Sequence, residues 1–264
     1  MKISTFRVIL FITALLFFSV FIPMGNLPSD TQYSVRTATS LCKGKISIDP
    51  SAHFLPPKLG RYGNYYSKYG IGYSMLFIPA AISASLLSPI LPHDYVLFGM
   101  AGCTNTIISS IIILLIFNLF MRLGYTKNIT LISIFSIASG SILLPYSKIN
   151  FAEIPTTLLL LIFLLKFHST GNLSFKNGVV FGILGAALIY LKIGNIIYCL
   201  CIIAAGLFYL PKKMFTPGGL IALTGLPSFA MLSLLVFNKY RFFNYLDFGY
   251  GTEQSMFTMP LIKG

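Results

Sequence analysis

Residues 95–121 read YVLFGMAGCTNTIISSIIILLIFNLFM, a run that contains no aspartate, glutamate, lysine or arginine. A helix rises about 1.5 Å per residue, so about 20 apolar residues cross the roughly 30 Å hydrocarbon core of a bilayer. We therefore expect this run to form a transmembrane helix.

Further apolar stretches flank this run on both sides. They are Val8–Met24, Ile71–Leu91, Ile129–Leu144, Ile154–Leu165, Val179–Leu191, Ile196–Leu210 and Gly219–Phe237. Each is long enough to cross or nearly cross a bilayer if polar flanks reach the interface. The pattern predicts an all-α fold, a polytopic transmembrane helix bundle of about seven to eight membrane segments. Residues 71–238 would form the bundle and 239–264 an outer segment.

The composition excludes several classes of protein. The 264 residues are 56% hydrophobic and 9% charged, whereas soluble domains carry about 25% charged residues. A soluble enzyme, a disordered tail and a disulfide scaffold are therefore excluded. The net charge of +13 indicates membrane topology and lipid headgroup contact, and no nucleic acid partner. The three histidines and four cysteines show no metal-ligand spacing.

The N-terminal stretch 8–24 is predicted to be an uncleaved signal-anchor helix. A cleaved signal peptide is the alternative, but Phe21-Ile22-Pro23-Met24 lacks the small residues of a cleavage site. The polar segment 25–70 follows it with Asp30, six basic residues and several tyrosines. We expect this segment to be a first outer loop with juxtamembrane helices.

The connectors predict the topology. Residues 121–127, 166–176 and 211–213 are basic and free of acids, so the positive-inside rule places them with the N-terminus in the cytoplasm. An even number of crossings must then precede Arg122, so Ile71–Leu91 should not cross completely. All the acids then fall on the outer side, namely Asp30, Asp49, Asp94, Glu153, Asp247 and Glu253.

Two of these acids are candidate catalytic residues. Asp30 lies six residues after the first span, and Glu153 begins the span that follows Pro145-Tyr146-Ser147-Lys148. A carboxylate at the mouth of a helix bundle is costly unless it is solvated or paired, and it could act as a general base on a hydroxyl. The alternative for Asp30 is a helix N-cap before Thr31–Leu41.

Several outer cations and tyrosines are candidates for substrate binding. Lys148, Lys192 and Arg241 could neutralise a lipid phosphate or simply extend to the interface. A cluster of tyrosines could stack on a sugar or form an interfacial belt: Tyr62, Tyr65, Tyr66 and Tyr69. The sequence has no phosphate-binding loop and no zinc or serine-hydrolase motif, so a soluble nucleotide donor is unsupported.

Short motifs in five regions then carry a family resemblance. They are Ser29-Asp30-Thr31-Gln32-Tyr33 with Ala38–Leu41, Tyr66–Tyr73, Pro145–Lys148 with Glu153 and Pro155, Gly182–Lys192, and Asn244–Gly249 with Pro260-Leu261. In this order they resemble GT-C-type membrane glycosyltransferases, which include protein O-mannosyltransferases and lipid A aminoarabinose transferases. The resemblance spans residues 29–261.

The resemblance implies roles for individual residues. Asp30 would be the catalytic base, and Glu153 would be a second catalytic acid that holds the leaving group or the acceptor. Substrate-binding positions would be Tyr33, Lys68, Tyr69, Tyr146, Lys148, Lys192 and Arg241. This sequence departs from the family at Thr31, where many members have a second acid, and at Gly70-Ile71, where many have two prolines.

The resemblance also implies partners and a location. The donor would be a polyprenyl-phosphate-linked sugar, and the acceptor a hydroxyl of a lipid, glycan or protein. No cofactor is implied, and a divalent cation is allowed but not indicated. We expect a multi-pass protein of the plasma (inner) membrane of a prokaryote. We also expect the chain to be an N-terminal fragment, because the family continues past residue 264.

The alternative hypothesis is a non-enzymatic membrane protein. A catalytically silent fragment would keep every motif named above. A protein that binds or transports lipid-linked sugars is a further alternative, but transporters usually carry internal repeats, and no self-similar half is present in this chain.

Overall fold

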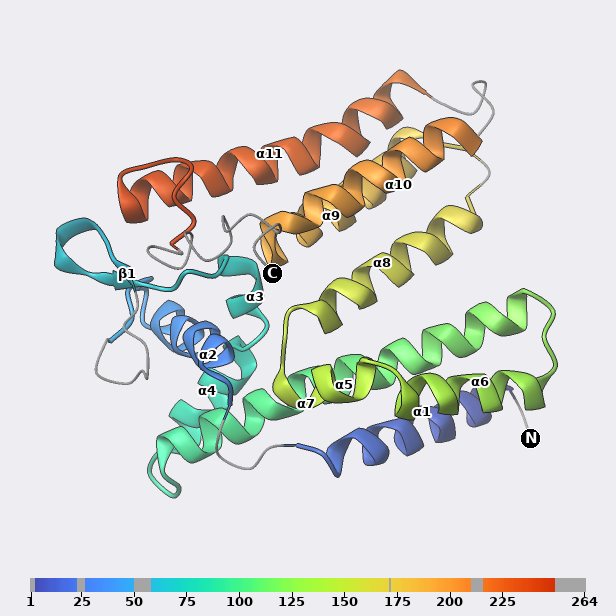
Figure 1. Ribbon diagram of the computed structural model, residues 1–264, viewed down its shortest axis with the longest axis horizontal. Coiled ribbons are helices and arrows are strands. Elements are labelled where there is room, and N and C mark those ends of the chain that lie inside the picture. Colours follow the sequence, from blue (N-terminus) through green and yellow to red (C-terminus); the bar gives the residue numbers. More distant parts are fainter. Residues whose placement is uncertain (1–2, 23–26, 50–57, 171, 210–215, 250–264) are drawn as a thin grey trace, which may run out of the picture.

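The computed structural model describes residues 3–22, 27–49, 58–170, 172–209 and 216–249. The protein is 76% helical, and the described residues form eleven α-helices (Figure 1). One short antiparallel hairpin departs from the predicted all-α fold, with β1 Lys58–Leu59 paired to β2 Tyr65–Tyr66. The predicted helical class is therefore confirmed, with this small sheet in the first loop.

The helices follow the apolar stretches closely. They are α1 Ile3–Ser19, α2 Ser29–Cys42, α3 Ile71–Met75, α4 Ile78–Leu87, α5 His93–Arg122, α6 Lys127–Gly140, α7 Leu143–Ile149, α8 Glu153–His168, α9 Phe175–Leu191, α10 Ile196–Tyr209 and α11 Pro217–Phe242, with the 3-10 turns η2 Arg61–Gly63 and η3 Ile193–Asn195. The segment 71–91 divides into α3 and α4, so it forms no single long helix. The stretch 129–144 is also divided, because α6 ends at Gly140.

Two helices are long and apolar enough to cross a membrane, α5 and α11. The pair α6 and α7 would be a third if it counts as one span, although it bends by 51°. Shorter apolar helices lie in α1, α4, α9 and at Ile193–Ala204. The described residues therefore give two or three candidate membrane spans.

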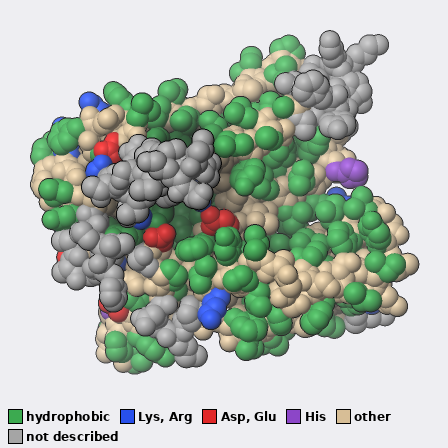
Figure 2. Space-filling model, viewed as in Figure 1, with side chains coloured by type: hydrophobic (Ala, Val, Ile, Leu, Met, Phe, Trp, Pro, Cys, Tyr) green, Lys and Arg blue, Asp and Glu red, His purple; other side chains and the backbone are tan. Residues whose placement is uncertain are grey.

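The loops that connect the helices lie in two groups, one at each end of the helix bundle. At one end, Lys127 lies 3.9 Å from the Phe6 ring, and Leu173 O accepts hydrogen bonds from Thr216 N at 3.2 Å and Oγ1 at 2.8 Å. The hairpin, α2 and α3 lie at the other end (Figure 1). The acidic side chains visible in Figure 2 all lie in the left half of the view, toward this second end. The predicted topology requires this separation of basic connectors from acids.

Helices α9 and α11 pack closely through small residues. A Cβ atom at Gly178 would overlap with Gly219, and one at Gly182 would overlap with the Ala222 carbonyl oxygen. Such contacts let helix backbones approach without a hydrophobic driving force from the solvent. The pair α9–α11 thus forms a rigid wall that holds Lys192 and Arg241 at the acidic end.

Candidate functional site

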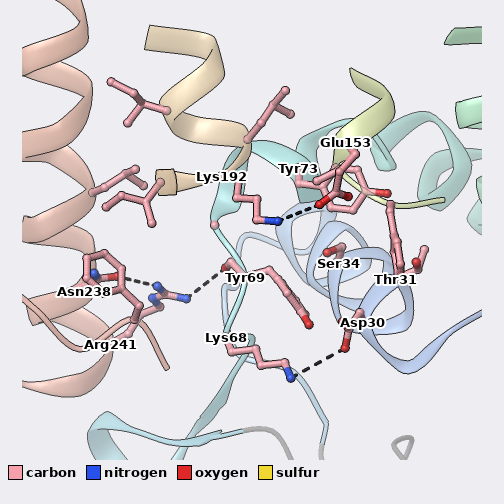
Figure 3. Close-up of a pocket in the computed structure, with 18 residues that line it drawn as sticks. Asp30, Thr31, Ser34, Lys68, Tyr69, Tyr73, Glu153, Lys192, Asn238 and Arg241 are labelled. Atoms are coloured by element: carbon pink, nitrogen blue, oxygen red, sulfur yellow. Dashed lines mark hydrogen bonds and ion pairs between the residues drawn. The ribbon is translucent and has the colours of Figure 1, made fainter. Parts of the chain in front are cut away.

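A cavity lies at the acidic end of the molecule, between α2 and α11 (Figure 3). Its volume is about 150 Å³. Five charged side chains line it, together with polar and apolar ones: Asp30, Lys68, Glu153, Lys192 and Arg241. The cavity therefore brings together side chains that are separated by more than 200 positions in the sequence.

Asp30 lies in the first turn of α2, where the positive end of the helix dipole stabilises its negative charge. Its Oδ1 is 3.8 Å from Nζ of Lys68, and 43% of its side chain is exposed, against 14% for Lys68. The helix begins at Ser29 after Pro28, and no side chain caps it. The N-cap interpretation of Asp30 is therefore wrong, and its carboxylate faces the cavity instead.

Glu153 is the first residue of α8, as predicted for the start of this segment. Its Oε1 accepts a hydrogen bond from Lys192 Nζ at 2.8 Å. Lys192 directly follows α9 and is its C-cap residue. Both side chains stay partly exposed, at 40% for Glu153 and 52% for Lys192. The ion pair joins two helix ends at the wall of the cavity.

Arg241 contributes a buried positive charge to the same wall. The residue is 4% exposed, and its guanidinium donates to Ser67 O and to Asn238 Oδ1, each at 2.7 Å. No carboxylate of the described residues lies within ion-pair distance of Arg241, and its Nε has no hydrogen-bond partner among them. Burying a cation without a paired carboxylate is costly, so this side is suited to an anionic ligand.

A network of buried polar side chains lies next to Asp30 and Glu153 in the sequence and connects three helices. Thr31 Oγ1 donates to Ile149 O at 3.0 Å and to Asn150 O at 3.1 Å, across more than 100 residues. Asn105 Nδ2 donates to Phe151 O at 2.9 Å, and its backbone N–H donates to Asn150 Oδ1 at 3.2 Å. The linker between α7 and α8 is thus tied to α2 and α5, next to both carboxylates.

Asn150 and Tyr73 complete this network. Asn150 adopts a left-handed conformation with φ 52°, which Asn tolerates better than most residues. The Tyr73 hydroxyl donates to Asn150 O. Tyr73 is 4% exposed, so this hydrogen bond is shielded from competing water.

Several residues that line the cavity were not predicted to be site residues. Ser34 is one helical turn after Asp30, is fully buried, and its Oγ has no hydrogen-bond partner in the described part of the chain. Thr31, Tyr73 and Asn238 also line the cavity. The i, i+4 spacing from Asp30 would have identified Ser34, whereas Asn238 could be found only from the packing of α11.

The predicted substrate-binding residues divide into two groups. Lys68, Tyr69, Lys192 and Arg241 line the cavity, and the buried Tyr33 ring lies 6.4 Å from the Tyr69 ring. Tyr146 and Lys148 do not line this cavity.

Those two residues belong to α7. Tyr146 packs against Phe151 with ring centroids 5.6 Å apart, and Lys148 is exposed. Their predicted binding roles have no support from the cavity.

A second cavity of about 390 Å³ adjoins the first. Glu153 and Lys192 line both, and Ile142, Leu160 and Ile197 give the second cavity apolar walls. The ion pair of Glu153 and Lys192 therefore lies at the boundary between the two cavities. Within the described residues, no group of three His, Cys, Asp or Glu side chains could hold a metal ion.

The chain was also compared with known proteins. It matches no family model, no curated protein and no solved structure. The chemistry of the cavity therefore carries the functional interpretation.

Proposed function

We propose that this protein is an integral membrane glycosyltransferase of the GT-C type. It would transfer a sugar from a polyprenyl-phosphate carrier to a hydroxyl at the outer face of a prokaryotic plasma membrane. The observation that carries the proposal is the cavity, in which Asp30 and Glu153 face Lys68, Lys192 and Arg241 in an otherwise apolar bundle. A cluster of ionisable side chains in an apolar helix bundle favours a functional site, and Arg241 is 4% exposed without a paired carboxylate among the described residues.

Each side of the cavity has a role in this reaction. Asp30 takes the proton of the acceptor hydroxyl as its oxygen bonds to the anomeric carbon. The bond from that carbon to the phosphate oxygen breaks, and the electron pair leaves with polyprenyl phosphate. Arg241 and Lys192 stabilise the charge on the departing phosphate. Glu153 orients Lys192 through their 2.8 Å hydrogen bond.

The full proposal extends beyond the cavity. It includes seven to eight membrane segments, with the shorter apolar helices as tilted or partial spans. The acceptor is a hydroxyl of a lipid, glycan or protein, and no cofactor takes part. A lipid-linked donor suits the site because its phosphate is a good leaving group, so activation of the acceptor is the main task.

One observation favours an alternative, namely a protein that binds the lipid-linked sugar without turnover. Both carboxylates already have lysine partners, at 3.8 Å for Asp30 and 2.8 Å for Glu153. Each carboxylate would have to leave its lysine partner before it could take a proton from an acceptor hydroxyl, whereas binding alone needs no such exchange. Binding of a labelled donor without release of free polyprenyl phosphate would support this alternative.

An Asp30→Asn variant tests the proposed base. Transfer from labelled polyprenyl-phosphate sugars should fall by about 10²–10⁴-fold, the usual contribution of general base catalysis. Donor binding should persist, because the cations remain. Asp49→Asn is the matched control, since Asp49 is an exposed acid of the same loop and does not line the cavity. Wild-type transfer by folded Asp30→Asn protein would refute the assignment.

A further inference from the structure

Exposed aromatic side chains surround two cations where the hairpin meets the end of α11. Arg61 lies over the rings of Tyr62, Tyr240 and Phe243, with distances of 4.7, 5.9 and 5.2 Å from its guanidinium carbon to the ring centroids. Lys239 lies 5.4 Å from the Tyr245 ring centroid. We call these six residues the interfacial patch: Arg61, Tyr62, Lys239, Tyr240, Phe243 and Tyr245.

The backbone of the patch is unusual. Tyr62 and Phe243 have φ values of 58° and 62°, in the left-handed region that large side chains rarely adopt. Both rings contact the same guanidinium, so the two strained positions converge on Arg61. Tyr62 is 76% exposed and Phe243 is 58% exposed. Burial of these rings therefore does not compensate for the strained backbone conformation. Strained residues held by their surroundings often mark functional sites.

The length of α11 places the patch at the membrane surface. Its 26 residues span about 39 Å, which exceeds the roughly 30 Å hydrocarbon core. Lys239 and Arg241 lie in its last turn, and charges avoid the hydrocarbon region. The last turn therefore lies at headgroup level, and the contacts of Arg61 hold the hairpin tip at the same depth.

The charge of the patch selects the type of headgroup. Among the described residues, neither Arg61 nor Lys239 has a carboxylate within ion-pair distance, and the nearby Asp247 is paired with Lys58 at 2.5 Å. Tyrosine rings favour the membrane interface, and each Lys or Arg near an anionic surface adds about 1 kcal/mol of attraction. Figure 2 shows Lys and Arg side chains beside hydrophobic ones at this end of the molecule.

We infer that the interfacial patch docks the hairpin of the first loop onto the bilayer surface and binds anionic lipid headgroups there. This inference is independent of the proposed transferase activity. It also assigns different roles to the tyrosines of the first loop. Tyr62 would contact lipid, Tyr66 is buried, and Tyr69 lines the cavity. Docking would hold the segment 67–70, which follows the hairpin, against the cavity.

Tryptophan fluorescence can test the docking directly, because the sequence contains no tryptophan. In Tyr62→Trp, the new indole is the only one, and lipids brominated near the headgroup should quench it in nanodiscs of phosphatidylcholine and phosphatidylglycerol. Phe229→Trp is the reference, since Phe229 is 69% exposed in the middle of α11. Its indole should be quenched most by bromines near the chain ends.

The headgroup preference is tested in the same background. Adding Arg61→Gln should lower the ratio of docked to undocked hairpin about fivefold, as expected for one interfacial cation. Removing phosphatidylglycerol should lower it about 30-fold, because Arg61 and Lys239 both lose their anionic partner. If brominated lipid leaves the emission of the Tyr62→Trp variant unchanged and aqueous iodide quenches it fully, docking is wrong. If quenching is equal with and without phosphatidylglycerol, the anionic preference is wrong.

Discussion

Replacing Thr31 by valine should remove the side-chain hydrogen bonds that connect α2 to the end of α7 and the linker before α8. The Thr31 hydroxyl is buried and serves two carbonyl groups, Ile149 O at 3.0 Å and Asn150 O at 3.1 Å. Valine has nearly the same shape but donates no hydrogen bond. The Asn150 carbonyl would still accept from Tyr73, whereas the Ile149 carbonyl would lose its side-chain donor.

The magnitude follows from this geometry. One shared hydrogen bond is worth about 1 kcal/mol, and a buried acceptor left without a donor costs about 1 kcal/mol more. The Thr31→Val variant should therefore lose about 2 kcal/mol of unfolding free energy. For a chain of this size, that loss lowers the melting temperature by about 4–8 °C. Thr31→Ser, which keeps the hydroxyl, should remain close to the wild type.

The assay can use the buried Cys199, which is 5% exposed. A thiol-reactive fluorogenic dye reports its exposure during heating, in a background where Cys42, Cys103 and Cys201 are replaced by serine. Thr106→Val is the matched control, because Thr106 is also buried but its hydroxyl, within the described residues, donates inside its own helix, to Gly102 O at 3.5 Å.

Two results would refute the reasoning. One is a Thr31→Val melting temperature equal to that of Thr31→Ser, which would mean that the hydroxyl contributes nothing. The other is an equal loss of melting temperature in Thr106→Val. That result would mean that any buried threonine has this effect, and that the hydrogen bonds from α2 to the linker add no particular stability.

Three further predictions concern the helix wall, the cavity and the topology. Gly182→Val should cost about 1–3 kcal/mol of stability, measured in the same dye assay, because its side chain overlaps with the Ala222 carbonyl; an unchanged melting temperature would contradict the packing of α9 on α11. Lys192→Gln should lower sugar transfer about 10–100-fold, the value of a hydrogen bond to a charged group, with little change in stability because the ion pair is half exposed. Lys148 lies outside the cavity, so the transfer rate of Lys148→Gln should stay within about twofold of wild type. If Lys148→Gln lost as much transfer activity as Lys192→Gln, a role specific to the cavity would be contradicted. The exposed Cys42 should react with a membrane-impermeant thiol reagent in intact cells; a thiol that reacts only after lysis would reverse the predicted topology.

Much of the fold could be predicted because each apolar stretch acts locally. Helix α5 covers 93–122 where the sequence predicted 95–121, and α11 likewise extends the predicted stretch at both ends. The break between α6 and α7 was missed, because the apolar residues continue through Ser141 and Ile142. The hairpin was also missed, since each strand has only two residues and gives no alternating pattern.

The candidate site was predicted only in part. Asp30, Glu153, Lys192 and Arg241 were identified from their charge in an apolar chain and Lys68 from the family resemblance, and all of them line one cavity. Ser34, Thr31 and Asn238 were missed as site residues because uncharged polar side chains are common in membrane helices.

The sequence by itself determined the helical class, the positions of the apolar segments and the absence of acids from the basic connectors. These properties follow from the cost of exposing polar groups to lipid, and each segment meets that cost independently. Only the tertiary structure decided which charges meet. Asp30 pairs with Lys68, Glu153 pairs with Lys192, and Thr31 donates a hydrogen bond to Asn150. These contacts depend on how helices that are distant in the sequence pack together, and no local sequence pattern specifies that packing.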